Sequence, residues 1–124
     1  MFASAVQCYV VDCITQDDLV VLLIKSKDIG KIVGYRGCIV KVFERLWQRK
    51  VKIVQYADEL SEIIKNYFRT NCKIEKNADY VKIFLPACEF GKCIAKNGVK
   101  AEALRKILKR HFKIEKVKFL PTDL

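Results

Sequence analysis

The chain has 124 residues, of which 52% are hydrophobic and 31% are charged. This length suits one domain or two small ones, and the composition is that of a core-forming protein, which excludes a disordered or fibrous chain. The longest apolar run, LVVLLI at residues 19–24, is too short to span a bilayer, and the first residues do not resemble a secretory signal. We therefore expect a cytoplasmic protein without a membrane segment.

The charge of the chain is strongly basic, with 24 lysine and arginine residues against 14 aspartate and glutamate residues and a formal net charge of +10. Residues 1–56 carry 9 basic and 5 acidic side chains, and residues 57–124 carry 15 and 9. Excess positive charge in both halves suits a polyanionic partner better than a single basic tail would. A solvated lysine-rich surface without such a partner has the same composition.

The first half predicts a hairpin, two helices and a third strand, in that order. VQCYVVDCI and LVVLLIK flank the polar turn TQDD, and KVKIV alternates as the closing strand. Between them, Ser26 can cap a short helix over KDIGKIV, and a longer helix follows GYRG. The longer helix has one apolar face, which we expect to be core, formed by Ile39, Val42, Phe43, Leu46 and Trp47.

The second half predicts the same order with a helix over residues 58–69 in front, whose apolar face comprises Leu60, Ile63, Ile64, Tyr67 and Phe68. CKIE and YVKIFL are expected as strands around the turn KNAD, and Pro86 suits the first turn of the next short helix. The segment AKNG then opens a longer helix, and KIEKVKF is expected to close the unit as a strand. The sequence therefore predicts an α+β fold with one domain over 1–56 and a second over 57–124. The apolar face of the longer helix comprises Leu104, Ile107, Leu108 and Phe112.

All five glycines of the chain lie in two related segments, IGKIVGYRG and FGKCIAKNG. The offset of 61 residues that aligns Gly30 with Gly91 also aligns Gly37 with Gly98. A glycine at either end of a four-residue loop lets the backbone turn sharply and approach a ligand without an intervening Cβ. The helix after the loop directs its unpaired N–H groups and positive dipole end at that ligand, so the loop suits a phosphate backbone. A helix cap with a tight packing point is the structural alternative.

A G-x-x-G loop between two amphipathic helices, after a hairpin and before a strand, resembles the KH domain, whose loop clamps single-stranded nucleic acid. The leading helix of the second copy resembles the type II form. The tandem pair, with IGKIVGYRG in the first copy and CIAKNG in the second, is similar to the archaeal NusA-like family of transcription factors. This resemblance covers residues 5 to 120. The resemblance implies two tandem type II KH domains, each a three-stranded sheet packed against helices. It further implies binding of nascent RNA during transcription elongation or termination, with RNA polymerase as a possible partner.

The resemblance also implies which residues bind RNA. Ala95 departs from the motif because it stands where the first glycine of the second loop is expected; its Cβ either keeps the RNA further away or is tolerated at a negative φ. Tyr35 is a candidate for stacking on a base. The RNA-binding residues expected in the first domain are Lys31, Gly34, Tyr35, Arg36, Gly37 and Lys41, and those in the second are Lys92, Ala95, Lys96, Asn97, Gly98 and Lys100.

No catalytic, cofactor or metal site is expected. The six cysteines include no C-x-x-C pair, and His111 is remote from them in sequence, so the usual zinc spacings are absent. Each cysteine lies in or beside an apolar stretch, and we expect the cysteines to be core residues. No nucleophile–histidine constellation and no phosphate loop of the G-x-x-x-x-G-K-[ST] type stands out, so we do not expect an enzyme.

Three functions remain compatible with these observations. The first is binding of single-stranded RNA in transcription. The second keeps RNA binding but places it on the ribosome or in RNA processing, where related type II KH modules occur. The third is a protein-interaction module of the transcription machinery, in which the basic charge meets an acidic patch on a partner. No small-molecule substrate is expected in any of them.

Overall fold

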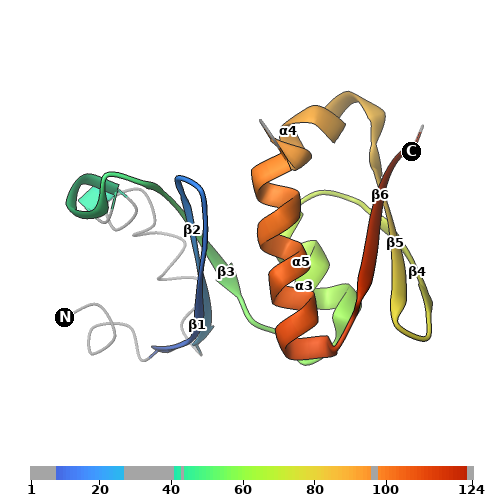
Figure 1. Cartoon of the computed structure of the whole chain (residues 1–124), viewed down its shortest axis with the longest axis horizontal. Coiled ribbons are helices and arrows are strands. Elements are labelled where there is room, and N and C mark those ends of the chain that lie inside the picture. Colours follow the sequence, from blue (N-terminus) through green and yellow to red (C-terminus); the bar gives the residue numbers. More distant parts are fainter. Residues whose placement is uncertain (1–7, 27–40, 43, 96–97, 123–124) are drawn as a thin grey trace. The chain divides into compact units, whose positions relative to one another are not determined.

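The computed structural model describes residues 8–26, 41–42, 44–95 and 98–122. The chain divides into two compact units, Met1–Asp58 and Glu59–Leu124, and each contains a three-stranded sheet (Figure 1). With helices in the described part of both units, the predicted α+β class is confirmed. The domain assignment over 1–56 and 57–124 remains a prediction, because compactness alone does not identify a kind of domain.

The sheet of the first unit consists of β1 (Cys8–Gln16), β2 (Leu19–Ser26) and β3 (Lys50–Gln55), in the order β1-β2-β3. β1 and β2 form the predicted antiparallel hairpin, which turns at Asp17 with a φ of 53°. β3 pairs with β2 in parallel, and a parallel pair needs a long crossover connection. Residues 27–49 supply this connection.

The central strand of the first unit is buried along its length. Every side chain from Leu19 to Ile24 is buried, as expected of a middle strand that reads as a continuous apolar run. In the neighbouring β3, Val51, Ile53 and Val54 are also buried. The hydrophobic core of this unit therefore centres on β2.

The predicted core face of the longer helix in the first unit is wrong at three positions. Residues 41–42 and 44–47 are helical, but Val42, Leu46 and Trp47 are 54%, 69% and 43% exposed. Helical periodicity tells which side chains share a face, but not what that face packs against. Ile39 and Phe43 lie outside the described residues, as does the short helix that Ser26 was expected to cap. Ser26 itself is the last residue of β2.

The second unit has the predicted order of elements, with a leading helix (Figure 1). β4 pairs antiparallel with β5, and β6 pairs in parallel on the other side of β5. Its elements are α3 (Leu60–Phe68), β4 (Lys73–Asn77), β5 (Tyr80–Pro86), the 3₁₀ turn η1 (Ala87–Glu89), α4 (Phe90–Ile94), α5 (Val99–Phe112) and β6 (Lys116–Thr122).

The core of the second unit lies between the sheet and the two longer helices, α3 and α5, which cover one face of the sheet in Figure 1. β5 alternates, so that Val81, Ile83 and Leu85 are fully buried. The predicted apolar stripes meet these strands and are largely confirmed as core, although Leu60, Phe68 and Phe112 are only half-buried. The helical side chains that are buried here are Ile63, Ile64 and Tyr67 of α3 and Ala101, Ala103, Leu104, Ile107 and Leu108 of α5.

Two predicted element boundaries in the second unit are wrong. Pro86 ends β5 with φ −54° and ψ 132° and precedes η1, instead of lying in the first turn of a helix. The fixed φ of proline suits both positions, and only ψ distinguishes them. The last strand begins at Lys116 and not at Lys113, because Lys113 adopts the left-handed conformation (φ 56°) that ends α5.

Candidate nucleic-acid interface

The loop between α4 and α5 reverses the chain in four residues, from Ala95 to Gly98. The N–H of Ala95 donates to the carbonyl oxygen of Gly91 at 2.8 Å and ends α4. At the other end, the N–H of Gly98 donates to the carbonyl oxygen of Ala95 at 3.1 Å. The two ends of the loop are therefore joined directly, while Lys96 and Asn97 lie outside the described residues.

Both ends of this loop have a positive φ. Gly98 has φ 67° and ψ 24°, and a Cβ added there would meet nothing closer than 4.0 Å, so the backbone conformation and not crowding favours glycine. Ala95 has φ 69° and ψ 173°, in a region that is essentially restricted to glycine. The negative φ that would have made alanine easy to tolerate is therefore not observed. Alanine holds this conformation at a cost of about 1–3 kcal/mol.

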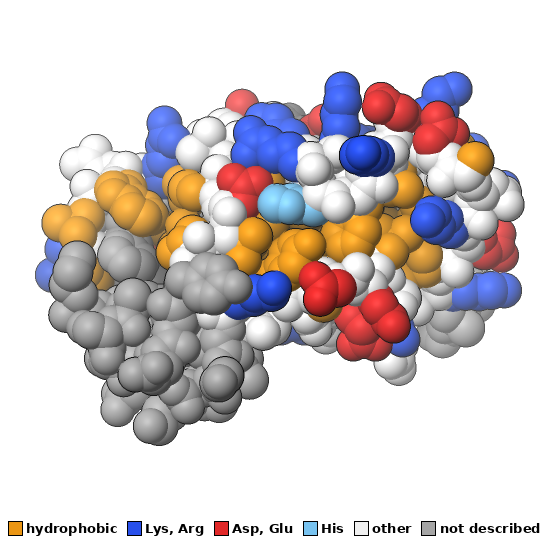
Figure 2. Space-filling model, turned by 90° about the horizontal axis from the view of Figure 1, so that it is seen from below, with side chains coloured by type: hydrophobic (Ala, Val, Ile, Leu, Met, Phe, Trp, Pro, Cys, Tyr) orange, Lys and Arg blue, Asp and Glu red, His pale blue; other side chains and the backbone are white. Residues whose placement is uncertain are grey.

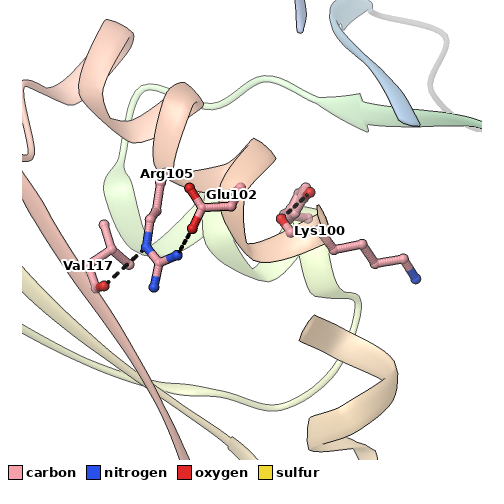
Figure 3. Close-up of polar contacts among 5 residues, drawn as sticks. Lys100, Glu102, Arg105 and Val117 are labelled. Carbon is pink, nitrogen blue, oxygen red and sulfur yellow. Dashed lines mark hydrogen bonds and ion pairs between the residues drawn. The ribbon is translucent and has the colours of Figure 1, made fainter. Parts of the chain in front are cut away.

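The first turn of α5 faces the loop without a side-chain cap. The N-cap is Gly98, which has no side chain to accept a hydrogen bond from the first turn. The helix therefore presents unpaired N–H groups and the positive end of its dipole beside the loop. The acidic residue of this turn, Glu102, forms an ion pair with Arg105, as Figure 3 shows. That pairing offsets the negative charge nearest the loop.

Two lysines and one arginine near the loop differ in what they contact. Lys92 on α4 is exposed, and Lys100 on α5 has no ion-pair partner among the described residues. Arg105 instead bends back, donating from Nε to the carbonyl oxygen of Val117 at 3.4 Å (Figure 3). Its guanidinium also lies 5.1 Å from the ring centre of Phe119. Lys92 and Lys100 are therefore available to an anion, whereas Arg105 is engaged within the unit.

Other charges of the chain do not gather by sign on the face seen in Figure 2, where lysine and arginine lie among aspartate and glutamate. Of the predicted site in the second unit, the structure places Lys92 on α4, Ala95 and Gly98 at the two ends of the loop, and Lys100 in the first turn of α5. Of the predicted site in the first unit, only Lys41 is described, and it is exposed on a helix. The remaining predicted residues, Lys31, Gly34, Tyr35, Arg36 and Gly37, lie outside the described residues.

Sequence comparison gives similarity to archaeal proteins of one name. No protein-family model matches the chain. It is 32% identical over 120 residues to "Probable transcription termination protein NusA" of Methanocaldococcus jannaschii, covering 90% of this chain and 64% of that protein. It is 25% identical over 122 residues to the protein of the same name from Halococcus morrhuae, covering 94% and 88%. The chain is therefore similar to archaeal NusA-like proteins.

The extent of the similarity differs among the relatives. A protein of the same name from Methanococcus vannielii is 30% identical over 84 residues, covering 68% of this chain and 47% of that protein. The NusA-like chain thus spans 64% of the Methanocaldococcus jannaschii protein and about half of the Methanococcus vannielii protein. The crystal structure of APE1850 matches it with a TM-score of 0.69 at 22% identity, over 95% of this chain and 91% of that one. At this identity the match shows a shared fold.

One contact at the edge of the site was not predicted. The hydroxyl of Tyr67 on α3 donates to the carbonyl oxygen of Lys100 at 2.7 Å. The sequence places Tyr67 on the buried face of its helix, and this is confirmed, since the side chain is fully buried. Burial raises the pKa of the Tyr67 hydroxyl well above its ordinary value of 10.0. Nothing in the spacing of residues indicates which carbonyl a buried tyrosine reaches.

The cysteines of the NusA-like chain only partly follow the prediction of core positions. Cys93 is buried and Cys72 half-buried, but Cys13 and Cys88 are exposed, so the prediction is wrong for these two. Cys13 alternates with the buried Ile14 along β1, and a strand turns successive side chains to opposite faces. None of these four thiols forms a disulfide. Burial raises the pKa of the Cys72 thiol, and the nearby Lys65 ammonium partly opposes that effect.

Within the described ranges, no group of three or more histidine, cysteine, aspartate or glutamate side chains could hold a metal ion. No helix in the part of the chain that the structure describes has the length and apolar character needed to cross a membrane.

Proposed function

We propose that this NusA-like chain binds single-stranded RNA through two type II KH domains, over residues 1–56 and 57–124, and acts in transcription elongation or termination. The observation that carries the proposal is the loop from Ala95 to Gly98, which has a positive φ at both ends. This loop lies between two helices, after a hairpin and before a strand that pairs in parallel with β5. In a KH domain the loop at this position clamps about four nucleotides.

The arrangement of the first unit supports the same assignment. Its sheet repeats that of the second unit, with an antiparallel hairpin followed by a third strand parallel to the second. Helical residues at 44–47 precede β3, as α5 precedes β6. We assign the first clamp to Gly34, Tyr35, Arg36 and Gly37, flanked by Lys31 and Lys41.

The electrostatics of the second unit favour a phosphate backbone. The uncapped first turn of α5 supplies N–H donors, and Lys92 and Lys100 supply positive charge without an ion-pair partner in the described part of the chain. Each lysine that neutralises a phosphate releases a counterion, so the affinity for RNA should fall as salt rises. Lys96 and Asn97 complete the second clamp in this proposal.

The role in transcription rests on the relatives, which are named "Probable transcription termination protein NusA". Carried to this chain, the name favours nascent RNA as the ligand and RNA polymerase as a partner over the ribosome. It also favours a binding protein over an enzyme. Pull-down from an archaeal lysate, scored for polymerase subunits and ribosomal subunits separately, tests this part of the proposal.

The experiment that tests RNA binding compares a labelled single-stranded RNA with a duplex RNA of equal length. The unaltered chain should prefer the single strand. Loss of that preference is expected in the first-loop variant Tyr35→Asp/Arg36→Asp and, separately, in the second-loop variant Lys96→Asp/Asn97→Asp.

A matched control is available on β4, where Lys76 and Asn77 are the same consecutive pair of residue types as Lys96 and Asn97. Both residues of the control pair are exposed. The variant Lys76→Asp/Asn77→Asp changes the net charge as much as the second-loop variant does, and it should bind RNA nearly as well as the unaltered chain. Equal binding of single strand and duplex by the unaltered chain and all variants would contradict the proposal and favour a protein-interaction module.

A further inference from the structure

Tyr67 joins the leading helix to the start of the helix that follows the loop. Its hydroxyl donates to the carbonyl oxygen of Lys100 at 2.7 Å, from α3 to the first turn of α5. Lys100 is the second residue after Gly98, at the carboxyl end of the loop. A contact made from outside the helix–loop–helix segment thus holds the backbone just beyond the loop.

The side chain of Tyr67 is itself held rigidly. It is fully buried, and its ring packs edge-on against Phe68, with ring centres 5.1 Å apart. Phe68 packs in the same manner against Phe119 of β6, with ring centres 6.0 Å apart. The hydroxyl is a donor at physiological pH, since the pKa of a tyrosine is about 10 and burial raises it here. A carbonyl oxygen has two lone pairs, so Lys100 can accept this bond in addition to a helix hydrogen bond.

The side chain of Lys100 extends away from the helix, whereas Arg105 folds back onto the unit (Figure 3). Lys100 is half-buried and has no ion-pair partner within the described ranges. Its backbone is therefore fixed by Tyr67 while its ammonium group is left for a ligand. This combination suits a lysine whose position, and not only whose charge, contributes to binding.

We propose that Tyr67 is a positioning residue for RNA, and that its hydroxyl fixes the backbone from which Lys100 presents its ammonium group to a phosphate. This inference rests on the proposed function, and it assigns part of the RNA-binding machinery to the leading helix α3, outside the loop and its two flanking helices. Tyr67 acts through Lys100 and does not touch the RNA.

A double-mutant cycle of Tyr67→Phe and Lys100→Ala tests the inference, with binding of a labelled single-stranded RNA of mixed sequence as the measurement. Tyr67→Phe keeps the ring and removes the donor, and it should weaken binding about fivefold, the factor that one ordinary hydrogen bond is worth. Lys100→Ala should weaken binding and reduce the slope of log affinity against log salt by about 0.7, the value for one phosphate contact on a single strand. In the Lys100→Ala background, Tyr67→Phe should cause no further loss.

A control separates positioning from general stability. Ile83→Val removes a methylene-sized volume from the sheet core and should lower the thermal unfolding midpoint without weakening RNA binding. Unchanged binding by Tyr67→Phe would overturn the inference. So would a loss of equal size in the Lys100→Ala background, or an equal loss in Ile83→Val.

A second measurement needs no Tyr67 variant. In an α-helix the amide of Leu104 pairs with the carbonyl of Lys100, and it should exchange with solvent as slowly as the amide of Leu108 in the unaltered chain. Fast exchange at Leu104, typical of a frayed helix end, would overturn the inference. Absence of RNA binding by the unaltered chain would instead overturn the proposed function, and the inference would fall with it.

Discussion

The N–H of Gly98 donates to the carbonyl oxygen of Ala95 at 3.1 Å, so the residue that departs from the glycine pattern is bonded directly to the glycine that keeps it. The bond closes the loop, and both residues have a positive φ. Ala95 therefore adopts the backbone conformation of a glycine while retaining its methyl group. The departure in sequence is not matched by a departure in backbone geometry.

The first prediction concerns Ala95→Gly, which should stabilise the second unit. The observed conformation costs alanine about 1–3 kcal/mol, and glycine loses about 0.5–1 kcal/mol in unfolded-chain entropy. The free energy of unfolding should therefore rise by about 1 kcal/mol, measured by urea denaturation. The control is Ala87→Gly in η1, where φ is not positive and the same substitution should lower stability. A fall in both variants would contradict the strain at Ala95.

The second prediction separates Arg105 from Lys100. Arg105→Met should lower the free energy of unfolding by about 1 kcal/mol, because the hydrogen bond to Val117 and the contact with the Phe119 ring are both lost and both are partly exposed to solvent. RNA affinity should fall less than in Lys100→Ala, because only the loss of the cation that pairs with Glu102 affects the loop, at a temperature where the variant is folded. Lys100→Ala should show the opposite result, with weaker binding and unchanged stability. Equal effects on binding would contradict this division.

The third prediction is a loss of stability at alkaline pH that depends on Tyr67. Its pKa is raised in the folded chain by burial, so its contribution to stability is fully present below the unfolded value of 10.0 and is lost as pH rises above it. Above pH 10, unfolding should become easier by about 1.4 kcal/mol per pH unit for this one group. Tyr67→Phe should show a shallower decline than the unaltered chain, measured by denaturation at a series of pH values. Parallel declines in the two proteins would contradict the assignment.

The fourth prediction concerns the order in which thiols react with an alkylating reagent. Cys13 and Cys88 are exposed and should react first, and the buried Cys93 should react only after local unfolding. Cys72 should react slowly at neutral pH, because its raised pKa leaves little thiolate, and faster as the pH rises. Peptide mapping by mass spectrometry measures each site separately. Early labelling of Cys93 would contradict its position in the core.

The sequence predicted the order of the elements well, because strand alternation, helical periodicity and turn residues act locally. The hairpin at Asp17 and the buried stripe of α3 are examples. Periodicity could not tell that Leu46 and Trp47 would be exposed, since that depends on what packs against the helix. The alternation around Lys113 predicts a strand there. In the structure Lys113 instead adopts a left-handed conformation and ends the preceding helix.

The candidate site was less predictable than the fold. Glycine spacing located the loop, but the positive φ of Ala95, which accompanies the hydrogen bond from Gly98, has no signature in residue type. Lys100 and Arg105 are equivalent in sequence, as basic residues on one helix. They differ because Val117 and Phe119 lie within reach of one and not the other. Such contacts join segments that are distant in the sequence, so local patterns carry no information about them.

The parallel pairing of β6 with β5 has a consequence for the order of folding. Tyr80 pairs with Lys116, and the whole of α4 and α5 lies between them in the chain. The sheet of the second unit therefore cannot be completed until its last strand has emerged from the ribosome, and loop closure over this distance makes the pairing late. Until then β5 pairs with β4 alone, and its other edge has no strand neighbour. During synthesis, the second unit should remain sensitive to proteases and chaperones longer than its compact final form suggests.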